Sequence, residues 1–254
     1  MFVPSSENAA TLEWQIPMTR FRVAFVACNV LCATAFPASA HHGQDFLLVE
    51  SPQVPHPGDA YLLANSALAL DDAEERAGFE PALLVGVTPR IAFELHAHAE
   101  KLAGESWRYE ATAPAIHVLL SDPARHDGLK VGLSAEHEIA RAAEEADNLQ
   151  LRLGIERASG AMKWAGNLVY DREQGGDHTV GAALGWRRQL GERFAMGVEA
   201  QGAFDHGEGR ELLGALYWEH EQRWTLKFGL GAVHGDSGGY DPLARLGLVL
   251  RLRD

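Results

Sequence analysis

Apolar side chains recur at every second position in many segments of this 254-residue chain. Side chains on a β-strand point to opposite faces in turn, so this spacing predicts strands with one apolar face and one polar or small-residue face. The alternation is clearest in 91–95, 129–134, 149–156, 194–201, 226–231 and 245–253. Polar, glycine-rich stretches between the runs predict turns and loops. Counting the runs from residue 58 predicts about 12 strands, within a range of about 10–14.

Transmembrane barrels and soluble β-sandwiches both have strands with this alternation. Here glycine and charges of both signs occupy the polar positions, and no helical layer is available to cover a sheet. Aromatic residues fall near the ends of predicted strands, where a barrel has its interfacial girdles. They are Trp107, Tyr109, Trp164, Tyr170, Trp186, Tyr217, Trp218 and Trp224. We therefore predict an all-β, antiparallel transmembrane β-barrel over 58–254, with a soluble sandwich as the alternative.

The first 40 residues differ in character from the alternating region. Residues 19–22 are basic, 23–36 are mostly apolar, and 37–40 place small residues where signal peptidase requires them. We predict a non-native extension over 1–17, a signal peptide over 18–40 that is cleaved after Ala40, and a periplasmic tail over 41–57. The residues before Cys28 resemble a lipoprotein box, but cleavage there would leave too short an apolar region for a working signal. Cys28 and Cys32 both belong to the leader, so the remaining chain has no thiol chemistry.

An exported barrel belongs in the outer membrane of a Gram-negative cell, with the lipid bilayer and the barrel-assembly machinery as its partners. The formal net charge of −13 argues against nucleic acid as a partner, because an acidic protein repels phosphate.

Charged and polar residues at the inward positions are candidates for lining the lumen, where they avoid contact with lipid. The candidates are Glu94, His96, His98, Glu136, Arg152, Glu199, Lys227, Arg245 and Arg251. Opposite charges would pair across a narrow barrel, and such pairs would either block the lumen or set its selectivity.

The segment 94–100 carries a candidate metal site. On a strand, Glu94, His96, His98 and Glu100 project to one face, and His96 and His98 are close enough to share one Zn²⁺ or Ni²⁺ ion. The alternative is a polar stripe that pairs with lysine and arginine across the lumen, without any cofactor. Signal cleavage would also expose His41 as an N-terminal residue, a type that binds copper in some proteins.

The chain contains none of the GxSxG, HExxH or phosphate-loop motifs. Ser134 and His137 are three residues apart and so face opposite sides of a strand, which is the wrong geometry for a nucleophile and its base. We therefore predict that the protein is not an enzyme.

The alternation and the 190–193 hairpin (Leu-Gly-Glu-Arg) resemble the twelve-stranded, porin-like outer-membrane barrels of Gram-negative bacteria. This group includes proteins associated with phenol degradation or transport. The resemblance covers the chain after the leader and implies an outer-membrane barrel that passes small solutes. Two other functions stay open: a soluble periplasmic β-protein that binds metal through His96 and His98, and a barrel enzyme that acts on lipid.

Overall fold

The computed structural model describes residues 44–70, 75–122, 128–142, 146–176, 178–204, 210–220, 223–234 and 239–253. Several predictions lie outside these residues: the extension (1–17), the signal peptide (18–40) with its cleavage site Ala40, and the copper-binding role of His41. Within the described ranges, no helix has the length and apolarity needed to cross a membrane.

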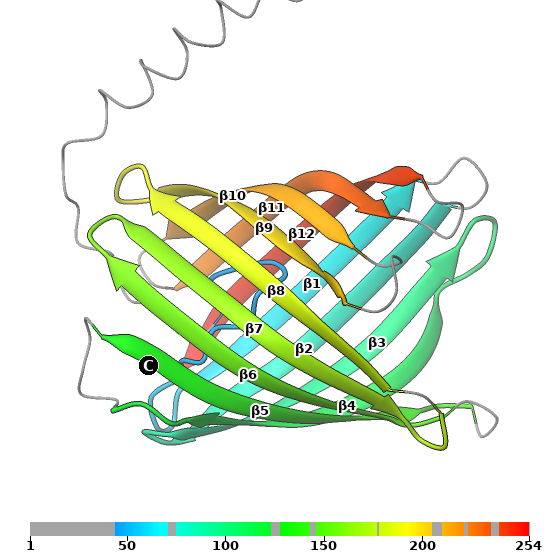
Figure 1. Ribbon diagram of the computed structural model, residues 1–254, viewed down its shortest axis with the longest axis horizontal. Coiled ribbons are helices and arrows are strands. Elements are labelled where there is room, and N and C mark those ends of the chain that lie inside the picture. The colour runs from blue at the N-terminus through cyan, green and yellow to red at the C-terminus, as the bar shows by residue number, and fades with distance from the viewer. Residues whose placement is uncertain are drawn as a thin grey trace, which may run out of the picture. The chain divides into compact units, whose positions relative to one another are not determined.

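The chain folds into a closed antiparallel barrel of 12 strands (Figure 1). The strands are β1 (Ala60–Leu70), β2 (Glu75–Thr88), β3 (Ile91–Leu102), β4 (Arg108–Leu119), β5 (Leu129–Ala140), β6 (Asn148–Ser159), β7 (Met162–Glu173), β8 (His178–Gln189), β9 (Phe194–Ala203), β10 (Glu211–His220), β11 (Trp224–His234) and β12 (Tyr240–Arg253). Each strand pairs with its neighbours in sequence, and β1 closes the barrel by pairing with β12. The predicted barrel is confirmed, and the soluble sandwich is wrong.

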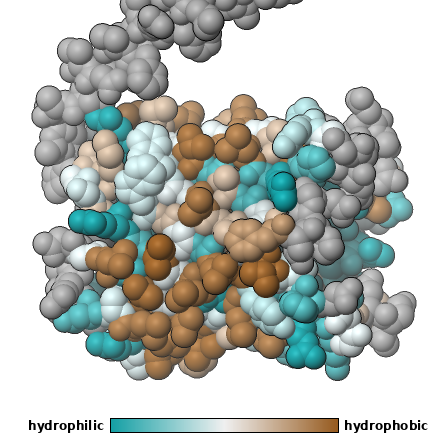
Figure 2. All heavy atoms as spheres, in the orientation of Figure 1, coloured by the Kyte–Doolittle hydropathy of each residue, from teal (hydrophilic) through white to brown (hydrophobic). Residues whose placement is uncertain are grey.

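The two faces of each strand differ as the sequence pattern predicts. On β10, Leu213, Ala215 and Tyr217 are buried, whereas Leu212 and Leu216 are exposed. The exposed apolar side chains form the outer surface of the barrel, seen as the brown area in Figure 2. Exposed apolar area of this extent is stable against lipid rather than water, and a closed barrel leaves no strand edge unpaired. The barrel therefore spans a bilayer, in the manner of outer-membrane proteins.

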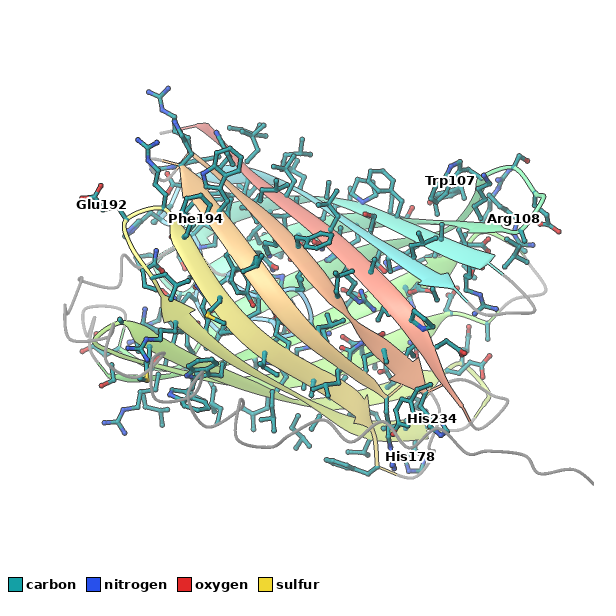
Figure 3. The ribbon with its side chains drawn as sticks, turned by 90° about the horizontal axis from the view of Figure 1, so that it is seen from above. Trp107, Arg108, His178, Glu192, Phe194 and His234 are labelled. Atoms are coloured by element: carbon teal, nitrogen blue, oxygen red, sulfur yellow. The ribbon has the colours of Figure 1, made fainter. Side chains whose placement is uncertain are left out.

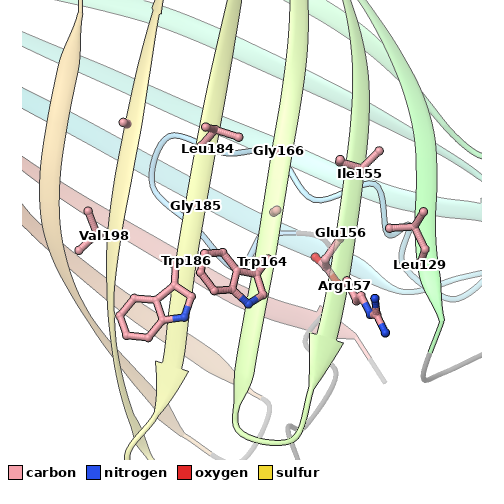
Figure 4. A pocket seen from close by; sticks show the side chains of 12 residues that line it. Leu129, Ile155, Glu156, Arg157, Trp164, Gly166, Leu184, Gly185, Trp186 and Val198 are labelled. Atoms are coloured by element: carbon pink, nitrogen blue, oxygen red, sulfur yellow. The ribbon is translucent and has the colours of Figure 1, made fainter. Parts of the chain in front are cut away.

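Aromatic side chains collect on the outer surface at both ends of the barrel. Phe194 and Trp107 mark opposite ends in Figure 3. Trp164 and Trp186 lie side by side on the outer face, with ring centroids 6.0 Å apart, next to an apolar groove of about 370 Å³ (Figure 4). Rings in these positions match the two interfacial girdles of a membrane barrel. Tyr217 is the exception, because its side chain points inward and is buried.

The connections between strands differ at the two ends of the barrel. The short-turn rim, where β1 begins and β12 ends, carries 89–90, 120–128, 160–161, 190–193 and 221–223. The long-loop rim carries 71–74, 103–107, 141–147, 174–177, 204–210 and 235–239. Short turns thus gather at one rim, as predicted, except for the long connection 120–128. Gly160 makes the β6–β7 turn tight, because its φ of +57° is a conformation that L-residues disfavour.

Candidate functional site in the barrel lumen

Residues 44–59, here called the lumen segment, lie inside the barrel (blue in Figure 1). Asp45 pairs with Lys163 near the start of β7, and the Gly58 amide donates to the Gly86 carbonyl near the end of β2 at 2.9 Å. Both of these contacts are close to the short-turn rim. Between them the chain reaches Glu199, in the middle of β9. The lumen segment therefore enters and leaves by the same rim and turns back about halfway along the barrel.

This location differs from the periplasmic tail that we predicted for 41–57. Phe46 and Val49 are each only 2% exposed and pack against Ala165 and Ala183 of the barrel wall. Burying these apolar side chains favours docking of the segment. The sequence of the segment has no strand alternation, and a local pattern carries no information about contacts with distant strands.

Glu199 is the main anchor of the lumen segment. Its carboxylate accepts hydrogen bonds from the backbone amides of Leu47 (2.9 Å), Leu48 (2.6 Å) and Val49 (3.4 Å), and from the Tyr217 hydroxyl (2.5 Å). Three successive amides around one oxygen pair form a concave anion site. Because Glu199 is fully buried, these donors take the place of the water that its charge would otherwise require.

Three buried cations hold the beginning of the lumen segment. Lys163 and Arg187 both pair with Asp45, and Lys227 donates to the Phe46 carbonyl at 2.6 Å. Buried charges are costly unless they are paired, and removing one partner costs about 3–5 kcal/mol. These strand cations therefore pair with groups of the lumen segment, and not only with acidic residues on the opposite wall of the barrel.

Glu50 ties the turn of the lumen segment to three strands. Its side chain pairs with Arg152 on β6 and with His117 on β4, while its backbone exchanges two 2.8 Å hydrogen bonds with the Asn167 side chain on β7. Burial raises the pKa of the Glu50 carboxyl, but Arg152 and His117 lower it by more, so the pKa lies well below its usual range. Glu50 is therefore held as a carboxylate.

Glycines make room for the lumen segment on the inner wall. A Cβ at Gly86 would lie 2.2 Å from the His56 carbonyl oxygen, and one at Gly185 would lie 2.7 Å from the Phe46 ring. Side chains at these positions would displace the segment. The alternation placed glycines on the polar face but did not explain them. The structure shows that these two leave space for the lumen segment.

Above the lumen segment, towards the long-loop rim, lies a polar cavity of about 260 Å³. One wall carries a histidine–carboxylate cluster, which consists of Glu94, His96 and His98 on β3 and Glu136 and Glu138 on β5. His96 Nε2 lies 3.3 Å from Glu94 and 3.4 Å from Glu136, and His98 Nδ1 lies 3.8 Å from Glu138. His117 connects this cluster to the lumen segment, because its ring lies 2.8 Å from Glu94 and 3.2 Å from Glu50.

Alanines on the intervening strand β4 bring the two halves of the cluster together. The inward residues of β4 opposite the cluster are Ala111, Ala113 and Ala115, all of which are buried. Strands β3 and β5 lie about 10 Å apart, at twice the usual strand spacing. Histidine and glutamate side chains can therefore meet over the alanine methyl groups, which larger residues on β4 would prevent.

The nine residues predicted to line the lumen all project inward, in three groups. Arg152, Glu199 and Lys227 contact the lumen segment. Arg251 pairs with Asp59 at the end of that segment, and Arg245 pairs with Glu211 on β10. The other four belong to the histidine–carboxylate cluster: Glu94, His96, His98 and Glu136.

Sequence reasoning missed Lys163, Asn167 and Tyr217, and it missed the lumen segment itself. We predicted Tyr217 as a girdle residue because it falls near a strand end, yet the alternation of β10 puts it on the opposite face from Trp218. A usable signal was the apolar run 46–49 between Asp45 and Glu50, which is unusual for a solvent-exposed tail.

The comparisons with known proteins bear on the fold. No protein-family model matches the chain, and no curated protein matches it. The KdgM porin matches with a TM-score of 0.55 and 7% identity, covering 76% of this chain and 99% of that one. The NanC porin matches with a TM-score of 0.56 and 7% identity, covering 75% of this chain and 100% of that one. An outer-membrane channel from Pseudomonas putida F1 matches with a TM-score of 0.55 and 12% identity, covering 78% of this chain and 97% of that one. At such identities the likeness shows that this chain has the fold of the outer-membrane porins.

Proposed function

We propose that this protein is an outer-membrane channel for small polar solutes, narrowed from its short-turn end by the lumen segment. The observation that carries the proposal is a membrane-spanning barrel with an apolar outer surface and a polar cavity of about 260 Å³ above the segment. A polar interior inside an apolar belt is the arrangement of water-filled barrels. The KdgM porin and the Pseudomonas putida channel are named for this class of function.

The charges at the cavity favour cations over anions. The four carboxylates Glu80, Glu94, Glu136 and Glu138 have only histidines as ion-pair partners within 4.0 Å among the described residues. Two arginines also line the cavity, and both are paired: Arg152 on β6 with Glu50, and Arg245 on β12 with Glu211. Acidic residues at a channel mouth raise the local concentration of cations.

Planar-bilayer recording of the refolded protein, from residue 41 onward, tests this function. We expect small, discrete conductance steps in KCl and a reversal potential of the cation-selective sign under a KCl gradient. Glu80→Gln combined with Glu138→Gln should reduce that reversal potential. If neither the wild type nor Glu199→Gln, which removes the charge that anchors the lumen segment, shows any conductance, the protein is a closed structural barrel and not a channel.

The proposal includes the outer-membrane location, insertion by the barrel-assembly machinery and export through a signal cleaved after Ala40. Heat-modifiable mobility in detergent gels, loss of the protein from the outer membrane on depletion of the assembly machinery, and N-terminal sequencing of the mature protein test these points. Extraction without detergent would contradict the outer-membrane location and the assembly step, and would favour the soluble periplasmic metal-binding protein. An N-terminus other than residue 41 would contradict cleavage after Ala40.

We do not propose a lipid-directed enzyme. Ser134 hydrogen-bonds to Glu50 on the inside of the barrel, whereas His137 is exposed on the outside and lies 3.7 Å from Asp147. The pair therefore lacks the contact that a nucleophile and its base require. Lipid profiles that change on deletion of the gene and recover only with an intact Ser134 would contradict this reasoning.

A further inference from the structure

We propose that the histidine–carboxylate cluster binds one divalent transition-metal ion in the lumen, with His98, Glu136 and Glu138 as its ligands. Candidate ligand atoms of these three residues all lie within 4.8 Å of one another. The ligands of a tetrahedral zinc ion are about 3.4 Å apart when each is about 2.1 Å from the metal. Side-chain rotations that move the ligand atoms by about an ångström would therefore close the site without moving the strands.

The polar atoms around these three ligands are incompletely satisfied. Nε2 of His96 and of His98 are both buried and have no hydrogen-bond partner among the described residues. The same holds for Oε1 of Glu94, whose side chain is only 1% exposed and which points at His96, 3.3 Å away. Unsatisfied polar atoms in a buried site are costly, and a bound cation would give such carboxylate and imidazole atoms a partner.

The charge of the cluster also calls for a cation. The described residues place no lysine or arginine within 4.0 Å of Glu94, Glu136 or Glu138, and a histidine balances a carboxylate only when it is protonated. One divalent ion would neutralise two carboxylates while keeping the histidines neutral, which is the form that coordinates metal.

The donor set selects the class of metal. A mixture of imidazole nitrogen and carboxylate oxygen suits Zn²⁺, Ni²⁺ or Co²⁺, whereas Mg²⁺ and Ca²⁺ prefer oxygen alone. An ion can reach the site from the long-loop rim, because the side chains of His98, Glu136 and Glu138 are 24%, 22% and 36% exposed. The sequence suggested that His96 and His98 share one ion. In the structure their ring centroids are 6.1 Å apart, and β5 supplies the nearer partners of His98.

Titration calorimetry with Zn²⁺ tests the site on the refolded protein, without an affinity tag. His41 and His42 are replaced by alanine throughout, so that the N-terminus contributes no binding. We expect one ion per chain, with affinity at least tenfold weaker in His98→Gln and in Glu138→Gln. His137→Gln is the matched control, because His137 lies between Glu136 and Glu138 in sequence but faces outward. It should leave the affinity unchanged.

Retained heat-modifiable mobility shows that each variant is folded. Thermal stability gives a second readout: Zn²⁺ should raise it in the parent protein and not in the two variants with weakened affinity. Absence of binding in the parent protein would overturn the proposal. So would an affinity that is equal in the parent and the two variants. Equal affinity for Mg²⁺ would also overturn it, because it would indicate an acidic patch without histidine ligation. None of these results depends on whether the barrel conducts.

Discussion

Replacing Glu199 by glutamine should release the lumen segment and leave the barrel intact. Glutamine keeps one acceptor oxygen but puts an NH₂ donor where the other oxygen was. If the NH₂ group takes the place of the oxygen near Leu48, the Leu48 amide faces another donor, and if it takes the other place, the Tyr217 hydroxyl must change from donating to accepting. The barrel depends on backbone pairing between strands and does not need this contact.

The size of the effect follows from these bonds. A buried polar group that loses its partner costs about 1–3 kcal/mol, and the remaining bonds weaken from about 1.5–3 to about 0.5–1.5 kcal/mol each when their acceptor loses its charge. We take a total of about 3 kcal/mol, which shifts the equilibrium between docked and undocked segment by about 100-fold.

Limited proteolysis with chymotrypsin measures this shift at Phe46 and Leu47. When opening is fast relative to cleavage, the cleavage rate follows the population of the undocked form. We expect cleavage about 100-fold faster in Glu199→Gln, together with a larger conductance in planar bilayers. Glu211→Gln is the matched control, because Glu211 is an inward carboxylate on the adjacent strand that pairs with Arg245. Equal cleavage rates in Glu199→Gln and the wild type would refute the anchoring role of Glu199.

Three other predictions concern the docking of the lumen segment and the lipid-facing surface of the barrel. Because the pKa of Glu50 is lowered in the folded protein, its contribution to docking is complete above the usual glutamate pKa of about 4.3 and is lost as the pH falls through the lowered value. Cleavage of the segment by pepsin should therefore accelerate in strong acid, and less steeply in Glu50→Gln; identical acid profiles would contradict this. Gly86→Ala should increase cleavage, since its Cβ would lie 2.2 Å from the His56 carbonyl oxygen, whereas Gly78→Ala on the same strand has nothing within 4 Å and should have no effect. Leu184 is 65% exposed on the outer face, so Leu184→Arg should destabilise the barrel in vesicles by about 2–4 kcal/mol in urea unfolding; a cost no larger than that of Leu184→Ala would argue against lipid contact there.

The barrel was largely predictable because its pattern is local. A strand between lipid and lumen must alternate, so runs such as Phe194, Met196 and Val198 indicate both the strand and its outer face. The same periodicity put Glu199 and Lys227 on the inner face. The same alternation puts Tyr217 on the inner face, which is opposite to the girdle position that we predicted for it.

The position of the lumen segment could not be predicted in this way. Leu47 and Glu199 are 152 residues apart, and Lys163 and Asp45 are 118 apart. Contacts over such separations depend on which strands close the barrel and on the width of the lumen. The segment itself has neither strand alternation nor helical spacing, so its sequence alone resembled a tail.

By itself, the sequence determined the closed antiparallel barrel, its apolar exterior and the inward face of each strand, because side-chain direction on a strand follows from position alone. It also placed His96 and His98 on one face. Only the tertiary structure decided what those inward residues meet. Pairing of β3, β4 and β5 brings His98 to Glu136 and Glu138 across a row of alanines, and barrel closure directs Glu199, Lys163 and Arg187 onto one lumen segment. Partners on different strands are fixed by register and curvature, which no single strand encodes.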